Sequence, residues 1–138
     1  KIKDLGGIAK KAPILTFIFA IMLFSNVGLP GTSGFVSEFL IIFGVFQSNI
    51  YFGVIAALSV IIGASYMLWM FQKAILQDRA EGSSELNIKD LKIKEILALT
   101  PWVALIFIMG FFPDIFTNIY EPTVEAYLKD ILQIGATK

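Results

Sequence analysis

Apolar residues along the chain gather into long runs that polar residues interrupt at only a few places. The runs cover residues 14–46 with one interruption, residues 51–71 without any, and residues 96–112. Each run is apolar on all sides, unlike the one-sided stripe of a helix that lies on a soluble core. Residues 51–71 are long enough to cross a hydrocarbon layer of about 30 Å. The pattern predicts an all-α fold, a polytopic bundle of membrane helices with three transmembrane passes.

The first run is interrupted by residues that break helices. At about 1.5 Å per residue, residues 14–27 would make a helix of roughly 21 Å and residues 35–46 one of roughly 18 Å, so neither half crosses the bilayer comfortably alone. Between them stand Gly28, Pro30, Gly31 and Gly34. We therefore predict one discontinuous (broken) helix over residues 13–46. The alternative is a surface turn at 28–34, with an ordinary helix on each side of it.

The other segments complete the predicted order. They are a basic loop over 1–12, a helix over 50–72, a second basic loop over 73–95, a helix over 96–112 and an amphipathic helix over 122–134 that opens at Pro122. One face of this last helix is apolar, and it consists of Val124, Tyr127, Leu128, Ile131 and Leu132. The chain starts at Lys1, inside a segment with the composition of a loop. We therefore interpret residues 1–138 as the C-terminal part of a longer membrane domain.

The basic residues test the number of crossings. Four lie in residues 1–12, none in 47–50, five in 73–95 and two after Pro113. Lysine and arginine accumulate in cytoplasmic loops. Three crossings place both basic loops on the cytoplasmic side, whereas four crossings would place them on opposite sides. The charges therefore favour the broken helix.

Composition narrows the chemistry. The chain is 57% hydrophobic and 16% charged, against roughly 45–50% and 25% for a soluble domain. It contains no cysteine and no histidine, which removes disulfides, thiolate clusters, haem ligation and the usual zinc sites. A net charge of zero gives no reason to expect nucleic acid as a partner. Redox chemistry, if this protein takes part in any, must be carried by another chain.

Glu38 is the only carboxylate inside any apolar run. A charge in mid-membrane costs at least about 2.5–3.5 kcal/mol, and such residues usually face a bundle interior or a water-filled cavity. Broken helices mark binding sites in transporters because their unpaired backbone groups are tolerated only beside protein or water. We therefore predict that Glu38 carries protons. Under the surface-turn alternative it would be a solvated acid in the first turns of an ordinary helix.

Several polar side chains near the break are candidates to line a water path, although such residues more often bond only to backbone. They are Ser25, Asn26, Ser33, Ser37 and Tyr66. Tyr66 and Trp69 also suit the aromatic belt at the membrane surface. Lys73, next to this belt, is expected to extend its ammonium group to the interface.

Four segments resemble one known family, the antiporter-like M subunit (subunit 4) of proton-pumping NADH:quinone oxidoreductase, respiratory complex I. They are Asn-Val-Gly-Leu-Pro-Gly-Thr-Ser-Gly-Phe-Val-Ser-Glu-Phe at 26–39, Ala-Ser-Tyr-Met-Leu-Trp at 64–69, Asp-Leu-Lys-Ile-Lys-Glu-Ile at 90–96 and Gly-Phe-Phe-Pro at 110–113. The resemblance implies a discontinuous helix and places Glu38 in the proton channel, toward its exit. The related L and N subunits and the Mrp-type antiporters usually carry lysine at this position, so the acid points to the M subunit. The plastid-type homologue also carries it.

The resemblance further implies a setting. NADH, FMN, iron–sulfur clusters and quinone would bind to other subunits, and this chain would hold no cofactor. Its partners would be other membrane subunits of complex I, especially neighbouring antiporter-like subunits, together with the lipid bilayer. The location would be the bacterial cytoplasmic (inner) membrane, with the basic loops cytoplasmic. Two alternatives stay open: a subunit of an Mrp-type cation/proton antiporter, and a membrane subunit with only a structural role.

Overall fold

The computed structural model describes residues 7–78 and 88–136, with side chains described as far as Ile131. All regular structure in these ranges is helical, and they contain no strand. The elements in chain order are α1 (Ile8–Lys11), α2 (Pro13–Asn26), α3 (Ser33–Ser48), α4 (Ile50–Phe71), the π-helical turn η2 (Gln72–Leu76), α5 (Ile93–Phe111) and α6 (Asp114–Ala136).

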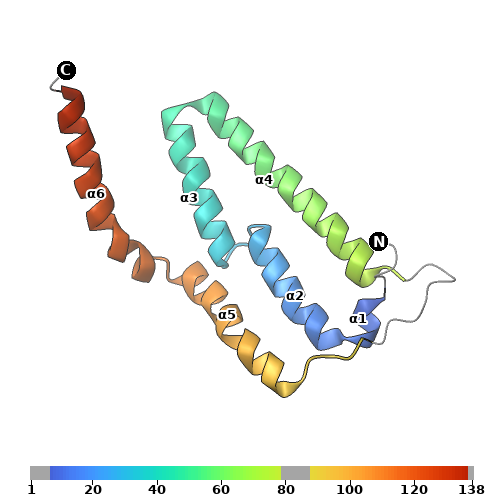
Figure 1. Ribbon diagram of the computed structural model, residues 1–138. Coiled ribbons are helices and arrows are strands. Elements are labelled where there is room, and N and C mark those ends of the chain that lie inside the picture. Colours follow the sequence, from blue (N-terminus) through green and yellow to red (C-terminus); the bar gives the residue numbers. More distant parts are fainter. Residues whose placement is uncertain (1–6, 79–87, 137–138) are drawn as a thin grey trace.

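The first three long helices form two rows, one of α2 followed by α3 and one of α4 (Figure 1). Helices α2 and α3 follow each other in the same general direction, and α4 returns alongside them. Helix α5 packs against both α2 and α3, near the point where these two meet. Helix α6 leaves the bundle and projects away from it. Residues 27–32, between α2 and α3, therefore lie where α5 can contact them.

The turn between α3 and α4 consists of one residue, Asn49. Its backbone is extended, and its side-chain oxygen accepts a hydrogen bond of 2.9 Å from the N–H of Tyr51, which caps the start of α4. Gly53, one turn into α4, lies under the ring of Phe46, since a Cβ added there would be 2.5 Å from that ring. The short link and the missing side chain hold α3 and α4 close together.

The buried apolar core is small and lies at one end of the bundle. It consists of Leu23 from α2, Phe71 from α4, and Ala74 and Ile75 from η2. Phe19 stacks on Phe71 with ring centroids 5.9 Å apart. Most other large apolar side chains are exposed, for example Phe17 at 67% and Trp102 at 64%. A chain with so much exposed apolar surface is adapted to an apolar environment, lipid or other protein.

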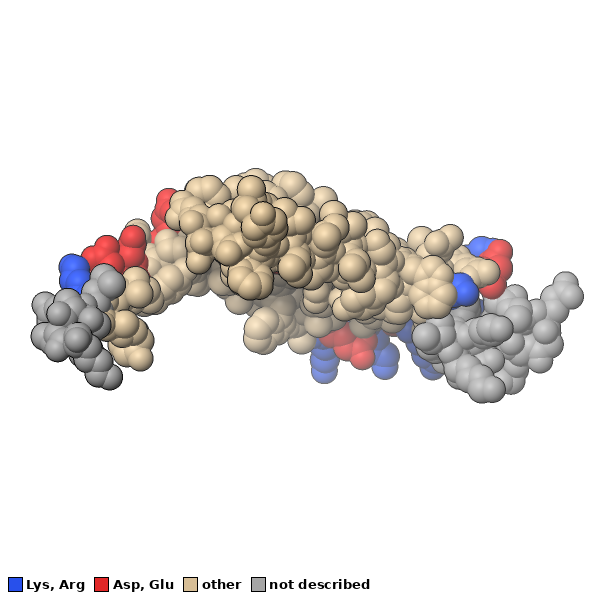
Figure 2. Space-filling model, turned by 90° about the horizontal axis from the view of Figure 1, so that it is seen from above, with Lys and Arg blue, Asp and Glu red and all other residues tan. Residues whose placement is uncertain are grey.

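Two of the described helices are long and apolar enough to cross a membrane: Ile50–Leu76, which joins α4 to η2, and Ile93–Phe111, which is α5. Helices α2 and α3 are apolar but shorter. Figure 2 shows that the Lys, Arg, Asp and Glu side chains lie in groups at the margins of the molecule, while the middle of this face is uncharged.

Several predicted boundaries differ from the structure. Residues 8–11 of the predicted loop 1–12 form the short helix α1. The predicted loop 73–95 loses both ends, because the helix of α4 continues to Leu76 and α5 begins at Ile93, where Glu95 accepts a hydrogen bond of 2.7 Å from the N–H of Lys92. Residues 1–6 and 79–87 of these two loops lie outside the described residues.

The last helix begins well before the predicted start at Pro122. It starts at Asp114 and contains Pro122 in its interior. Pro122 has no N–H to donate to the carbonyl of Asn118, one turn earlier, and the exposure of Asn118 leaves that carbonyl open to another donor. Phe116 and Tyr120 continue the i, i+4 apolar spacing of Val124 and Leu128 backwards past Pro122, which favours one helix through it. The side chain of Leu132, predicted for its apolar face, lies outside the described part.

Candidate functional site: the helix break and Glu38

Helix α2 ends in a complete glycine cap. The N–H of Gly28 donates to the carbonyl of Ser25 at 3.2 Å, and the N–H of Leu29 donates to the carbonyl of Phe24 at 3.0 Å. Gly28 has a left-handed backbone with φ +79°, which glycine adopts without steric cost. This is the Schellman arrangement, in which two carbonyls of the last turn gain donors. The break is thus a defined stop with its own hydrogen bonds.

Helix α3 begins beside a buried threonine. Thr32 is 1% exposed, and its hydroxyl and its N–H both donate to the carbonyl of Leu29, at 2.6 and 3.1 Å. This side chain therefore closes the loop and does not cap the first turn of α3. Gly31 supplies a second left-handed residue, with φ +90°. The first N–H groups of α3 lack a side-chain acceptor from the capping residue, which leaves a local positive end near the break.

Glycines let three backbones meet at the break. A Cβ on Gly34 would lie 1.7 Å from the carbonyl oxygen of Ser25, so the first turn of α3 rests directly on the last turn of α2. A Cβ on Gly110 of α5 would lie 2.3 Å from the carbonyl oxygen of Gly31. Helix α5 therefore packs on the backbone of the break itself. A larger residue at either position would require the backbone to move.

The carboxylate of Glu38 turns back onto this break. A Cβ on Gly28 would lie 2.6 Å from Oε2 of Glu38, so the acid occupies the space that glycine leaves free. Glu38 is half-buried, and no described residue forms a hydrogen bond or an ion pair with its side chain. It is also the only charged residue between Lys11 and Lys73. The structure thus places a lone carboxylate at the end of α2.

The predicted water-path residues are partly brought together. Ser25 is buried, and its hydroxyl oxygen lies 3.5 Å from that of Ser33. Ser37 donates to the carbonyl of Gly34 at 2.9 Å. Ser33 and Ser37 also line a cavity of about 130 Å³ between α3, the end of α5 and the start of α6. Three hydroxyls therefore follow one another from the break toward this cavity.

The other two predicted residues lie apart from this group. Asn26 is exposed at the last position of α2, and Tyr66 is on α4 with 61% of its side chain exposed. Neither forms a hydrogen bond through its side chain with any described residue. Pro30 is exposed within the break. Among residues 7–78 and 88–136, no group of three or more Asp or Glu side chains could hold a metal ion.

Asp90 fixes the other end of α2, away from the break, through a contact that the sequence analysis did not predict. Its carboxylate accepts the N–H groups of Ile14 and Leu15, both at 3.0 Å, and so caps the start of α2 from the segment that leads into α5. Partial burial raises the pKa of Asp90, but the N–H donors of Ile14, Leu15 and Leu91 outweigh it and hold this pKa below its ordinary value. Helix α2 has Ala12 at its own capping position, which cannot cap. The absence of a local cap was the available signal.

Both ends of α2 are thus fixed by other parts of the chain or by glycine, and a carboxylate with open hydrogen-bonding capacity lies against its far end. The arrangement therefore combines a helix break with an acidic side chain that has no hydrogen-bond or ion-pair partner among the described residues.

Comparison with known proteins finds similar chains. Residues 1–63 match the family model described as NADH:quinone oxidoreductase/Mrp antiporter, TM. Subunit M of the NADH-quinone oxidoreductase of Rickettsia bellii is 38% identical over 128 residues, which cover 93% of this chain and 26% of that protein. NADH-ubiquinone oxidoreductase chain 4 of Marchantia polymorpha is 34% identical over 124 residues, covering 90% of this chain and 25% of that one.

A solved structure extends the likeness to three dimensions. A chain of respiratory complex I from Thermus thermophilus with bound NADH superposes with a TM-score of 0.81 and 35% identity, over 94% of this chain and 27% of that chain. The chain spans about a quarter of the length of the relatives it matches. Residues 1–63 are thus similar to the NADH:quinone oxidoreductase/Mrp antiporter transmembrane family, and over most of its length the chain is similar to subunit M of NADH-quinone oxidoreductase.

Proposed function

We propose that this chain is part of a proton-translocating membrane subunit of complex I, in which Glu38 takes up and releases a proton in the exit half of a channel. The observation that carries the proposal is the position of Glu38, a half-buried carboxylate without a described partner, against the glycine cap of a helix break. Acidic side chains inside membrane segments usually face the bundle interior or a water-filled cavity and take part in proton relays.

The proposed topology has three passes. Helices α2 and α3 together make one discontinuous crossing, α4 with η2 makes the second and α5 the third. The apolar character of α2 and α3, their shared direction and their individual shortness support a single joint crossing. The segments that hold Lys10, Lys73 and Lys89 then lie on the cytoplasmic side of a bacterial inner membrane.

The subunit would contribute no redox chemistry. NADH, FMN, iron–sulfur clusters and quinone would be held by other subunits, and the partners of this chain would be neighbouring membrane subunits and lipid. The relatives named above are subunits of NADH-quinone oxidoreductase, which supports this assignment over an Mrp-type antiporter, although the matching family model covers both. Its acid at position 38 follows the M-subunit pattern.

The test is the substitution Glu38→Gln in the full-length subunit within the assembled complex. Glutamine has nearly the same shape but binds no titratable proton, so we expect proton pumping per NADH oxidised to fall while subunit content stays normal. Proton pumping is measured by quenching of a pH-sensitive dye in membrane vesicles, beside NADH oxidation. Glu125→Gln on α6, an exposed acid paired with Lys129 at 3.7 Å, is the matched control. Full pumping by assembled Glu38→Gln would remove Glu38 from the mechanism.

A further inference from the structure

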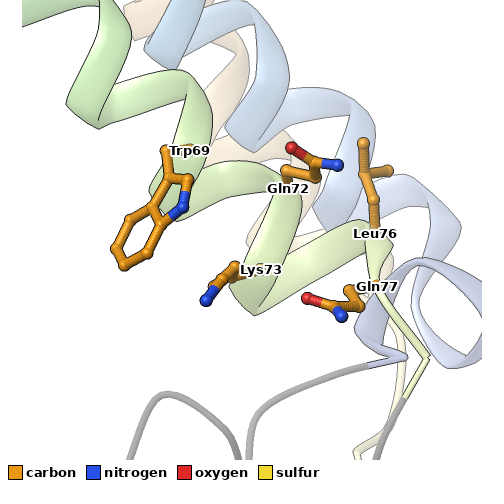
Figure 3. A pocket seen from close by; sticks show the side chains of 5 residues that line it. All are labelled: Trp69, Gln72, Lys73, Leu76 and Gln77. Carbon is orange, nitrogen blue, oxygen red and sulfur yellow. The ribbon is translucent and has the colours of Figure 1, made fainter.

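A pocket at the end of α4 is lined mainly by side chains that carry hydrogen-bond donor groups. Its volume is about 490 Å³, and Figure 3 shows the five side chains around it, Trp69 from α4, Gln72, Lys73 and Leu76 from η2, and Gln77 directly after it. The first four are spaced i, i+3, i+4 and i+7 and so share one helix face. The N–H of Gln77 donates to the carbonyl of Gln72 at 2.8 Å, a π-type bond that widens the last turn.

The pocket lining combines several N–H donors with one positive charge and no negative charge among its described residues. Trp69, Gln72, Lys73 and Gln77 all carry side-chain N–H groups, and none of the four forms a side-chain hydrogen bond or ion pair with a described residue. Lys73 is the only charged residue in the lining, and its Nζ lies 4.4 Å from the centroid of the Trp69 ring. Asp78, the next acid along the chain, is paired with Lys10 at 2.5 Å. The pocket is therefore cationic and rich in donors.

The position of the pocket suggests where its ligand comes from. It lies at the polar end of the longest apolar helix, Ile50–Leu76, where tryptophan and tyrosine are typical of the membrane surface. Tyr66, Trp69 and Leu76 are 61%, 53% and 51% exposed. Phosphate groups of lipids lie at this depth, and the apolar side chains below could contact a glycerol backbone and the start of an acyl chain.

We propose that this pocket binds the phosphate of an anionic phospholipid headgroup, with Lys73 as the charge partner and the N–H groups of Trp69, Gln72 and Gln77 as donors. The ammonium group of Lys73 lies over the Trp69 ring, 4.4 Å from its centroid, at the pocket that would receive the phosphate. Leu76 and the tryptophan ring bind the apolar part of the lipid, which a free phosphate ion lacks. The site is separate from Glu38 and does not depend on the proposed proton function.

The test uses the complete complex in detergent and a photoactivatable phosphatidylglycerol, followed by mass-spectrometric mapping of the labelled peptides. We expect labelling of the peptide that contains residues 66–78. Unlabelled phosphatidylglycerol should compete for this label, and phosphatidylcholine or inorganic phosphate should compete weakly or not at all. Equal competition by phosphatidylcholine would show that the charge is irrelevant, and competition by millimolar phosphate would show a site for free anions. Either result overturns the proposal.

Variants sharpen the result. Lys73→Gln should lower specific labelling about fivefold, the effect expected for one basic residue near an anionic surface. Lys73→Arg, which keeps the charge, should preserve labelling. Lys94→Gln removes an exposed lysine of α5 that is outside the pocket and should have no effect. Unchanged labelling of Lys73→Gln would contradict the proposed role of the lysine. The competition experiment on the unmodified complex decides the proposal even if Lys73→Gln does not assemble.

Discussion

Helix α4 and the pair α2–α3 run side by side and are both apolar, but α4 is continuous whereas the pair is interrupted. Helix α4 with η2 is continuous and carries no charge before Lys73, and its backbone groups pair along the helix. The α2–α3 pair stops at Asn26 and restarts at Ser33, with Glu38 one turn further on. A continuous apolar helix offers no polar surface in mid-membrane. The break supplies carbonyls, N–H groups and space for a carboxylate, which is why we propose the proton chemistry for the interrupted pair.

The largest loss of stability should come from a side chain placed in the contact between α2 and α3. Gly34→Ala places a Cβ against the carbonyl of Ser25, and since backbone atoms must move, we expect destabilisation of about 3 kcal/mol or more. The readout is thermal unfolding of the purified complex together with subunit content in membranes. Gly44→Ala, on the same helix with nothing within 4 Å of the added atom, is the control and should be stabilising by about 0.5–1 kcal/mol. Equal behaviour of the two variants would show that the halves do not pack as described.

An intermediate effect should follow from Gly28→Ala. The left-handed backbone costs about 1–2 kcal/mol for a residue with a side chain, and the new methyl group also displaces the carboxylate of Glu38. We therefore expect proton pumping per NADH to fall further than complex content does.

Gly7→Ala separates these two contributions. Gly7 has the same φ of +79° but nothing within 4 Å of the added atom, so it reports backbone strain alone. If Gly28→Ala and Gly7→Ala lowered pumping to the same extent, the contact between Gly28 and Glu38 would have no functional weight.

The smallest effect should come from the other end of α2. Asp90→Asn keeps the shape of the cap but removes its charge, so we expect a modest loss of thermal stability at neutral pH. The folded-state pKa of Asp90 is lowered, so its stabilising contribution is present above the ordinary carboxyl pKa of about 4 and disappears as the pH falls through the lowered value.

The measurement is thermal unfolding of wild type and Asp90→Asn over a range of acidic pH. The difference between the two proteins should begin to shrink as the pH falls below about 4 and should vanish below the lowered pKa of Asp90, where the folded wild-type carboxylate is protonated. A difference that stays constant over the whole range would mean that the charge of Asp90 does not contribute to the cap.

The break and its acid could be predicted from the sequence because their causes are local. Gly28, Pro30 and Gly31 stand in the middle of an apolar run, and Glu38 is the only charge nearby, so no tertiary information is needed to notice them. The start of α6 was predicted wrongly since a proline inside a helix is tolerated where the carbonyl one turn earlier is exposed. In that prediction, the local preference for proline at a helix start outweighed the apolar i, i+4 spacing that begins at Phe116.

Contacts between distant segments could not be predicted in this way. The bonds from Ile14 and Leu15 to Asp90 join residues 76 and 75 positions apart, and nothing in the composition of the polar loop distinguishes Asp90 from its neighbours. The packing of Gly110 on Gly31 is likewise a product of how α5 lies on the break. Sequence patterns predict which residues form helices and where charge is exceptional, whereas the partners of those residues depend on three-dimensional packing.

The contact between Gly110 and the carbonyl of Gly31 has a mechanical consequence. Two backbones that touch without intervening side chains have no soft atoms between them, so neither can be displaced without pushing the other. The ring of Phe111 also lies against Gly31, and α6 starts at Asp114, directly after this end of α5. Any tilt of α2 against α3 would therefore also displace the end of α5, to which α6 is joined through Phe112 and Pro113.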